Sequence, residues 1–431
     1  MAMYCNQCQQ TAKGVACTVA GVCGKNEDVA SLMDTLIYGL KGIAAYAYHA
    51  RALGKTDPEV DAFIEEALFK TLTNVDFSLE DSWNTLMRAG MINLKVMQML
   101  DAGNTEHFGL PAPTKVRTGT VKGPGILVTG HDLLDLEALL EQTQGTGVNV
   151  YTHGEMLPAN AYPGLKKYKN LIGNYGGAWQ NQKKDFKEFG GPILVTTNCV
   201  LIPPETYKGR LYTTSVAAVP GVKHIADRKD FSAIIKQAQE IGDLPERKGP
   251  DMWTGAHHKA VLSLAPQIID AVKAGKVKHF FLVGGCDGAT LGRDYYTQIA
   301  EKIPQDSIIM TLACGKYRFN EREYGDIGGI PRFLDLGQCN DAYSAIVLAV
   351  ELAKAFKVDV NELPLSIVLS WFEQKAVAIV LTLLALGIRD VRVGPTLPAF
   401  ITPNNWKLIQ DKFGWKAIGD PDEDLKDMLR A

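Results

Sequence analysis

The 431-residue sequence lacks the features that would place it in a membrane or on a nucleic acid. Its longest apolar run, Ala376 to Ile388, is too short to span a bilayer and predicts a buried helix. The first residues, MAMYCNQCQQTAKG, contain no apolar signal-peptide core. The net charge is -3 and basic runs are short, so neither nucleic acid nor a membrane surface is expected as a partner. We therefore expect a cytoplasmic protein, in which thiols stay reduced.

Familiar catalytic and phosphate-binding motifs are also missing. The segment GGCDGA (284–289) has neither G-x-G-x-x-G nor Walker spacing, and Lys316 after Cys314 and Gly315 gives no Walker match. No Ser-His-Asp order and no helix-turn-helix stand out. The glycines of 284–289 are instead expected to let the backbone approach a bound cluster.

No cysteine is left over, because all eight fall into two sets of four. One set lies within nineteen residues at the N-terminus, whereas each member of the other stands alone just after a short apolar run. A chain with reduced thiols that uses every cysteine in this way is expected to bind metal rather than form disulfides. The sets are Cys5, Cys8, Cys17 and Cys23, and Cys199, Cys286, Cys314 and Cys339.

The order of elements predicts an N-terminal helical bundle followed by two doubly wound, Rossmann-like α/β domains. Apolar spacing predicts helices at 29–53, 59–74 and 78–99, with Ser78 as a cap and Asp81 reaching back to it. Segment 103–113 is expected to be a linker. Short β-rich runs then alternate with helical stretches, which predicts parallel sheets. The expected domains are 1–118 (cysteine segment and three-helix bundle), 119–250 and 251–431; the expected strands are 126–130, 148–152, 193–197, 279–285, 307–313, 332–337 and 366–372.

Metal-ligating side chains follow nearly every one of these strands. Because ligands of open α/β sheets bind at the carboxyl ends of the strands, we expect these side chains to converge on one site. Each has a structural alternative: a buried cysteine is usually a small hydrophobe, His131 could cap a helix, and Glu373 could be a carboxylate at a helix start. Their joint occurrence disfavours coincidence. In chain order they are His131, His153, Glu155, Cys199, Cys286, Cys314, Cys339 and Glu373.

The two cysteine sets indicate different metal chemistry. The N-terminal spacing C-x2-C-x8-C-x5-C favours an iron–sulfur cluster, although a zinc site stays open. The second set mixes thiolates with carboxylates and an imidazole, which exceeds the need of one four-coordinate ion and suits a multi-iron cluster. Its oxygen-ligated side could keep open positions for a small substrate.

The chain resembles the hybrid cluster proteins, also called prismane proteins or hydroxylamine reductases. The matching stretches cover most of the sequence and are specific as a set. They are YCNQCQQTAKGVACTVAGVCGK, GHDLLDLEALLEQTQGTGVNVYTHGEMLPA, TTNC, VGGCDGA, TLACGKYRFN, DLGQCNDAYSA and LSWFEQKAVAIVLTLLALGI.

This resemblance implies a conventional cluster on Cys5, Cys8, Cys17 and Cys23, with the spacing of the [4Fe-4S] subgroup. It implies a second, hybrid iron–sulfur–oxygen cluster of the [4Fe-2O-2S] type, with Glu155 rather than His153 as a ligand. It further implies that Cys286 occurs as a persulfide and that Lys375 acts beside the ligands, so that Cys286, Glu155, Glu373 and Lys375 form the catalytic group. The implied hybrid-cluster ligands are His131, Glu155, Cys199, Cys286, Cys314, Cys339 and Glu373.

The resemblance implies a reductase that converts hydroxylamine, two electrons and two protons into ammonia and water, with electrons relayed by the N-terminal cluster from an external donor protein. Reduction of nitric oxide in nitrosative stress, or a non-enzymatic role as a redox sensor or in protein S-nitrosylation, stays open as an alternative. Longer family members have two helical bundles, whereas this chain has room for one and so resembles the short subgroup. A homodimer is a further expectation, and the missing bundle bears on the substrate channel, on the surface that it would cover and on the oligomeric state.

Overall fold

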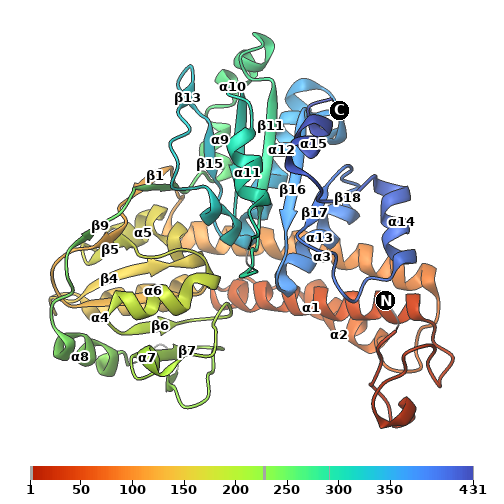
Figure 1. Cartoon of the computed structure of the whole chain (residues 1–431), viewed down its shortest axis with the longest axis horizontal. Helices are drawn as coiled ribbons and strands as arrows, with labels where there is room; N and C mark the ends of the chain where they lie inside the picture. Colours follow the sequence, from red (N-terminus) through yellow and green to blue (C-terminus); the bar gives the residue numbers. More distant parts are fainter. Residues whose placement is uncertain (1–2, 227–229, 291, 431) are drawn as a thin grey trace. The chain divides into compact units, whose positions relative to one another are not determined.

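The computed structural model describes residues 3–226, 230–290 and 292–430, and Figure 1 shows their order along the chain. These residues form two compact units. Unit 1 is Met1–Gly103 with Phe356–Ala431, and unit 2 is Asn104–Ala355. The division into three domains at 118 and 250 stays a prediction. Among the described residues, no helix is both long and apolar enough to cross a membrane.

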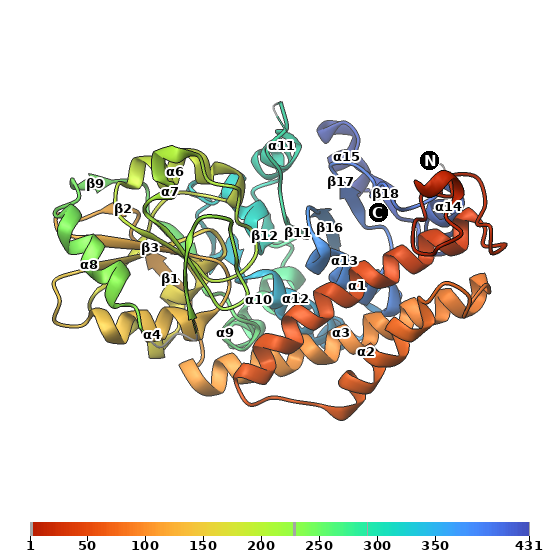
Figure 2. The same ribbon diagram turned by 90° about the horizontal axis from the view of Figure 1, so that it is seen from below.

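Three long helices follow the N-terminal segment of unit 1, as the apolar spacing predicts: α1 (Glu27–Ala52), α2 (Pro58–Lys70) and α3 (Leu79–Phe108). Asn26 caps α1 by accepting from the Val29 amide at 2.9 Å. Ion pairs join Glu66 of α2 to Arg88 of α3 at 2.7 Å, and Glu59 to Lys95 at 2.7 Å. An early residue of α2 thus meets a later one of α3, so these two helices, both visible in Figure 2, are antiparallel.

Two details near α3 differ from expectation. The Ser78 hydroxyl does accept from the Asp81 amide at 3.1 Å, but the Ser78 amide donates to Asp76 at 2.8 Å while Asp81 pairs with Lys70. The proposed linker at 103–113 is wrong in its first half, because α3 continues to Phe108. Gly103 lies within α3 and does not end it. The missing side chain at this position leaves room for Leu53 to pack there.

Helix α13 (Gln374–Ala385) confirms the buried helix expected at 376–388. It packs closely on α1 and α3 because glycines stand at the contacts. A Cβ at Gly39 would lie 2.6 Å from the Leu381 side chain, and one at Gly90 would overlap the Leu381 carbonyl. Asn93 of α3 also donates to Thr382 at 2.9 Å. The rest of unit 1 contains the parallel strands β16 (Leu365–Ser370), β17 (Arg392–Gly394) and β18 (Lys416–Ala417), with α14 (Pro403–Phe413), α15 (Pro421–Met428) and the 3-10 helices η1 (Ala12–Gly14) and η7 (Val360–Glu362).

Unit 2 contains a six-stranded parallel sheet in the order β5-β4-β3-β6-β7-β8, seen in yellow and green in Figure 1. Its central strands are buried over their whole length, as expected for a sheet covered on both faces. Its elements are β3 (Gly125–Thr129), α4 (Leu133–Thr143), β4 (Asn149–His153), η2 (Gly154–Ala161), α5 (Pro163–Lys166), β5 (Leu171–Asn174), η3 (Trp179–Asn181), α6 (Gln182–Phe189), β6 (Ile193–Val195), α7 (Glu205–Lys208), β7 (Leu211–Thr214), β8 (Lys223–Ile225) and α8 (Ser232–Ile241).

A second set of parallel strands in unit 2 follows the order β15-β12-β11. Short antiparallel pairs join β1 to β10, β2 to β9 and β13 to β14. Parallel α/β architecture is therefore confirmed. The elements are β1 (Thr114–Val116), β2 (Gly119–Thr120), β9 (Arg247–Lys248), β10 (Met252–Thr254), α9 (His258–Leu262), α10 (Ala265–Lys273), β11 (His279–Gly285), α11 (Tyr295–Lys302), β12 (Ser307–Thr311), η5 (Cys314–Arg318), β13 (Asp326–Ile327), β14 (Ile330–Pro331), β15 (Phe333–Asp335), η6 (Cys339–Asp341) and α12 (Ala342–Phe356).

The register of the strands aligns their last residues, so the turns with the predicted ligands begin at the same edge of each sheet. Thr129, the last residue of β3, pairs with His153 of β4 and with Val195 of β6. Likewise, Thr311 at the end of β12 pairs with Asp335 at the end of β15. Because the strands end together, the residues that follow them lie at the same edge of each sheet.

Candidate metal centres

The N-terminal cysteine segment is folded by short backbone contacts. Cys5 and Cys17 exchange two backbone hydrogen bonds of 3.1 and 2.8 Å, and the Thr11 amide closes a turn on the Cys8 carbonyl at 3.1 Å. Backbone amides of Ala12 and Val22 lower the pKa of the Cys17 thiol, which favours the thiolate that binds metal. No disulfide joins any of the eight cysteines, all of which lie in the described part of the chain.

Little apolar surface is buried within this segment. Met3 and Cys17 pack on Ala30 of α1, but Tyr4, Val15 and Val19 are exposed, Val19 at 86%. A segment with so small a core would need a bound metal to be stable, as small metal-binding modules do. Four cysteines in this setting fit either an iron–sulfur cluster or zinc by donor chemistry.

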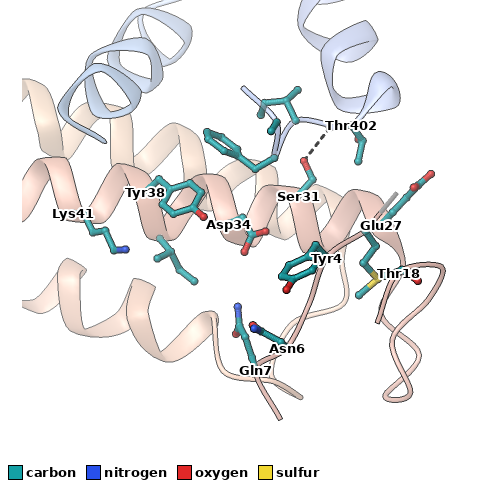
Figure 3. A pocket seen from close by; sticks show the side chains of 16 residues that line it. Tyr4, Asn6, Gln7, Thr18, Glu27, Ser31, Asp34, Tyr38, Lys41 and Thr402 are labelled. Atoms are coloured by element: carbon teal, nitrogen blue, oxygen red, sulfur yellow. Dashed lines mark hydrogen bonds between the residues drawn. The ribbon is translucent and has the colours of Figure 1, made fainter. Parts of the chain in front are cut away.

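A cavity of about 700 Å³ lies beside the cysteine segment, between it, α1 and residues 399–402 (Figure 3). Its wall includes Tyr4, Asn6 and Gln7, the immediate neighbours of Cys5 and Cys8. Asp34 of α1 also lines it, and burial raises the pKa of this carboxyl to about 6, although the charge of Lys25 opposes the shift. A molecule in this cavity would lie next to the cysteine segment.

In unit 2, His131 follows β3 and is buried. The suggestion that it caps α4 is wrong, because Asp132 does so, accepting from the amides of Leu134 at 3.0 Å and Asp135 at 3.1 Å. Nδ1 of His131 instead lies 2.9 Å from the Thr197 hydroxyl, which orients the ring. A histidine held through one nitrogen presents the other to a metal in many proteins.

Three predicted ligands from separate turns come together. Ligand atoms of His131, Glu155 and Cys339 all lie within 4.8 Å of one another, and all three residues are buried. Nε2 of His131 is 3.7 Å from Oε2 of Glu155, which also accepts from the Cys339 amide at 2.9 Å. This arrangement combines imidazole, carboxylate and thiol donors at the carboxyl ends of three strands.

The remaining cysteines of unit 2 lie near this group. Burial raises the pKa of the Cys314 thiol well above its usual range, and the charges of Glu155, Cys199 and Cys286 raise it further. Cys199 also packs on the buried cluster that contains Cys314 and Trp179. Several ionisable sulfur and oxygen atoms gathered in a buried space need bound cations to be stable as anions, so the donor set fits a multi-iron centre.

Strained backbone occurs at two of these turns. Cys199 itself has φ +68°, and Ala313, just before Cys314, has φ 62° and ψ -164°. Non-glycine residues rarely adopt these conformations, which cost of order 1–3 kcal/mol each and cluster at functional sites. The turns before His131, Glu155 and Cys286 use left-handed glycines at the equivalent place: Gly130, Gly154 and Gly285.

His153 is fully buried and both ring nitrogens are engaged. Nδ1 lies 3.2 Å from the Thr129 hydroxyl and Nε2 lies 3.1 Å from the Asp185 carboxylate. Asp185 also accepts from the Gly177 amide at 2.9 Å. Because both ring nitrogens are bonded to protein groups, we expect His153 to support the ligands rather than to be one of them.

Glu373 and Lys375 belong to unit 1. Glu373 caps α13 by accepting from the Lys375 amide at 3.0 Å, so the helix-start alternative describes its contact correctly. Its other oxygen lies 3.8 Å from Nζ of the buried Lys375, whose ammonium faces the Tyr46 ring at 6.0 Å. The role of Glu373 as the seventh ligand stays a prediction.

Sequence reasoning missed several buried residues that bond to the ligand turns. Trp179 donates to the Asp287 carbonyl at 3.0 Å, and Lys316 pairs with Asp335. The sequence motif around Lys316 gives only a failed Walker match and does not predict this buried ion pair. The signal that could have found it is charge directly after an apolar strand, because a lysine there must find an anion when it is buried.

Comparison with known proteins shows the family. A sequence model of the Prismane/CO dehydrogenase family matches residues 3–86 and 80–426. Hydroxylamine reductase of Moorella thermoacetica is 64% identical over 427 residues, covering 99% of this chain and 100% of its own. The chain belongs to the Prismane/CO dehydrogenase family. Membership of this family implies iron–sulfur clusters.

Other relatives extend the comparison. Hydroxylamine reductase of Thermotoga maritima is 52% identical over the full length of both chains. That of Geobacter metallireducens is 44% identical with both chains covered completely, but the alignment extends over 548 residues. This relative therefore has segments that the present chain lacks, which agrees with the short subgroup.

Among solved structures, carbon monoxide dehydrogenase from Thermococcus sp. AM4 shares the fold. Its TM-score is 0.79 at 17% identity, and the match covers 100% of this chain and 90% of that one. Carbon monoxide dehydrogenase IV from Carboxydothermus hydrogenoformans has the same TM-score at 16% identity, covering 100% and 92%.

Proposed function

We propose that this chain is a reductase of hydroxylamine, which takes up two electrons and two protons to give ammonia and water. The observation that carries the proposal is the buried site in which His131, Glu155 and Cys339 come together, with three further cysteines nearby. In addition, relatives of this chain are named hydroxylamine reductases. Mixed sulfur, oxygen and nitrogen donors suit a cluster that keeps an exchangeable position.

The proposed cofactors are a [4Fe-4S] cluster on the N-terminal segment and a hybrid [4Fe-2O-2S]-type cluster in the second site. When bound, the iron of the second site would supply Lewis-acid and redox chemistry to the N–O group. The seven proposed ligands of that site are His131, Glu155, Cys199, Cys286, Cys314, Cys339 and Glu373.

The chain's own residues orient the ligands and deliver protons. Thr197 fixes the ring of His131, so that Nε2 is directed to the side of Glu155. His153 is held by Thr129 and Asp185 and acts by orientation. Lys375, whose Nζ lies 3.8 Å from Glu373, is the proposed proton donor, because an ammonium beside a carboxylate can pass a proton to reduced nitrogen.

Electrons are proposed to enter from an external donor protein at the N-terminal segment. Tyr4, Val15, Val19 and Val22 are exposed there, and a partner that covers such apolar side chains would come close to the cysteines. Stopped-flow reduction with reduced methyl viologen should change the N-terminal cluster's absorbance before that of the second cluster. Reduction of the second cluster first would contradict this route.

The decisive experiment is anaerobic purification with iron and sulfide analysis, electron paramagnetic resonance and turnover of hydroxylamine with reduced viologen. Cys286→Ala and Glu373→Ala are expected to abolish turnover while the N-terminal spectrum survives. Glu423→Ala, at an exposed carboxylate, should match the wild type. Full activity in the first two variants, or zinc in place of iron, would overturn the assignment; spectra of both clusters without turnover would favour a sensor.

A further inference from the structure

Three consecutive side chains after Cys314 each bond to a different turn that carries a proposed ligand. They lie in the short 3-10 helix η5 (Cys314–Arg318), which follows β12. The three are Lys316, Tyr317 and Arg318. None of them is a proposed ligand, and their partners lie in the turns after β15, β4 and β11, all within unit 2.

Lys316 binds the turn that leads to Cys339. Its ammonium is fully buried and lies 2.6 and 2.8 Å from the two carboxylate oxygens of Asp335. It also donates to the Gly337 carbonyl at 2.8 Å, two residues before Cys339. All three N–H groups of the ammonium therefore have acceptors, and every acceptor lies just before the same ligand.

Tyr317 binds the turn that leads to Glu155. Its hydroxyl donates to the Gly154 carbonyl at 2.8 Å, directly before that ligand. Its ring packs on the buried cluster of Ala178, Trp179 and Cys314, on which Cys199 packs as well. The side chain thus connects the backbone beside Glu155 to the cysteines of the neighbouring turns.

Arg318 binds the turn that contains Cys286. Its guanidinium pairs with the fully buried carboxylate of Asp287 and donates to the Gly288 carbonyl at 3.0 Å. Trp179 donates to the Asp287 backbone carbonyl at 3.0 Å from the other side. The residue after Cys286 is therefore held at both its side chain and its backbone.

We propose that Lys316, Tyr317 and Arg318 are positioning residues that set the spacing of Cys339, Glu155 and Cys286 around Cys314. The proposal rests on the ligand set of the proposed function. Ligands supplied by four separate turns need a common reference, and one short helix bonded to the other three turns supplies it. If these three residues only satisfied buried polar groups, replacing them would leave the signal and the retention of the second cluster unchanged.

Tyr317→Phe is the mildest test, because it removes one oxygen and keeps the ring. We expect the electron paramagnetic resonance signal of the second cluster to change and its loss to a chelator to become about 10- to 100-fold faster. The N-terminal cluster's signal in the same sample is the internal control. Tyr168→Phe is the matched control, since that buried tyrosine donates its hydroxyl proton to the Glu141 carboxylate at 3.1 Å, and neither residue belongs to η5 or to a ligand turn.

Arg318→Lys keeps the charge and loses the planar fork, so it should change the second-cluster signal in the same direction as Arg318→Met but less. The proposal would be overturned if Tyr317→Phe and Arg318→Met both gave the wild-type signal of the second cluster and both lost this cluster to a chelator no faster than the wild type. A wild-type protein that binds only the N-terminal cluster would instead overturn the ligand set on which the proposal rests. A change confined to Tyr317→Phe and Arg318→Met, absent from Tyr168→Phe, supports it.

Discussion

Replacing Lys316 by methionine would leave the Asp335 carboxylate buried without its cation. Both side chains are fully buried and 2.6 Å apart, and the carboxylate also accepts from the Gly337 amide at 3.1 Å. Removing one partner of such a pair costs about 3–5 kcal/mol, because the remaining carboxylate must either stay charged in a medium that solvates it poorly or take up a proton. We expect the free energy of unfolding to fall by this amount near neutral pH.

The loss should depend on pH with a defined sign. Burial raises the pKa of Asp335 above its usual range, and Lys316 opposes this shift. In Lys316→Met that opposition is gone, so the folded variant holds a proton on Asp335 that the unfolded chain releases above about pH 4. The variant's deficit should therefore shrink as the pH falls toward 4 and grow as the pH rises through the folded-state pKa.

Chemical denaturation of the metal-free protein from pH 5 to 8 measures both effects. Lys407→Met is the matched control, because Lys407 is 71% exposed and its pairing with Asp411 contributes little. The double variant Lys316→Met/Asp335→Leu should recover most of the loss, since it removes the uncompensated charge. A single variant within about 1 kcal/mol of the control, or one with no pH dependence, would refute this account of the buried pair.

Three further predictions concern other parts of the chain. Gly90→Ala should destabilise the protein by about 1–3 kcal/mol in thermal or chemical unfolding, because a Cβ would overlap the Leu381 carbonyl, whereas Gly209→Ala should have little effect because nothing lies within 4 Å. Asp34→Asn should raise the melting temperature above pH 6 and leave it unchanged near pH 4. The pKa of the wild-type carboxyl is about 6, so the folded wild-type protein loses stability as this buried group ionises between these pH values. Equal shifts of the melting temperature at both pH values would contradict this. Asp132→Ala should cost about 1 kcal/mol by removing the cap of α4, measured by calorimetry, and no change would show that the cap is dispensable.

Much of the fold follows from local patterns in the sequence. Alternation of short apolar runs with helical stretches predicts the parallel sheets, and the Ser78 cap is found where expected. The predicted linker at 103–113 is wrong over its first half, because α3 continues to Phe108 and Gly103 serves close packing against Leu53. Glycine can end a helix or allow close packing, and only the neighbouring helix distinguishes the two uses.

The candidate site was predictable in composition but not in its contacts. Position after a strand was enough to select His131, Glu155 and Cys339, which the structure brings together. The sequence left a capping role open for His131, but the structure gives that role to the adjacent Asp132, which accepts from two amides. Cytoplasmic location, a homodimer and a seventh ligand at Glu373 stay predictions.

The sequence by itself determined which chemistry the chain can hold. Its eight cysteines, all in two sets, and the histidine and acids after its strands define a metal-binding protein, because donor identity is a property of the residues alone. Only the tertiary structure decided how the donors are held. Lys316, Tyr317 and Arg318 are neighbours in sequence, but their partners lie up to about 160 residues away, as Tyr317 and Gly154 do. Such long-range bonds depend on strand order and register, which no local pattern encodes.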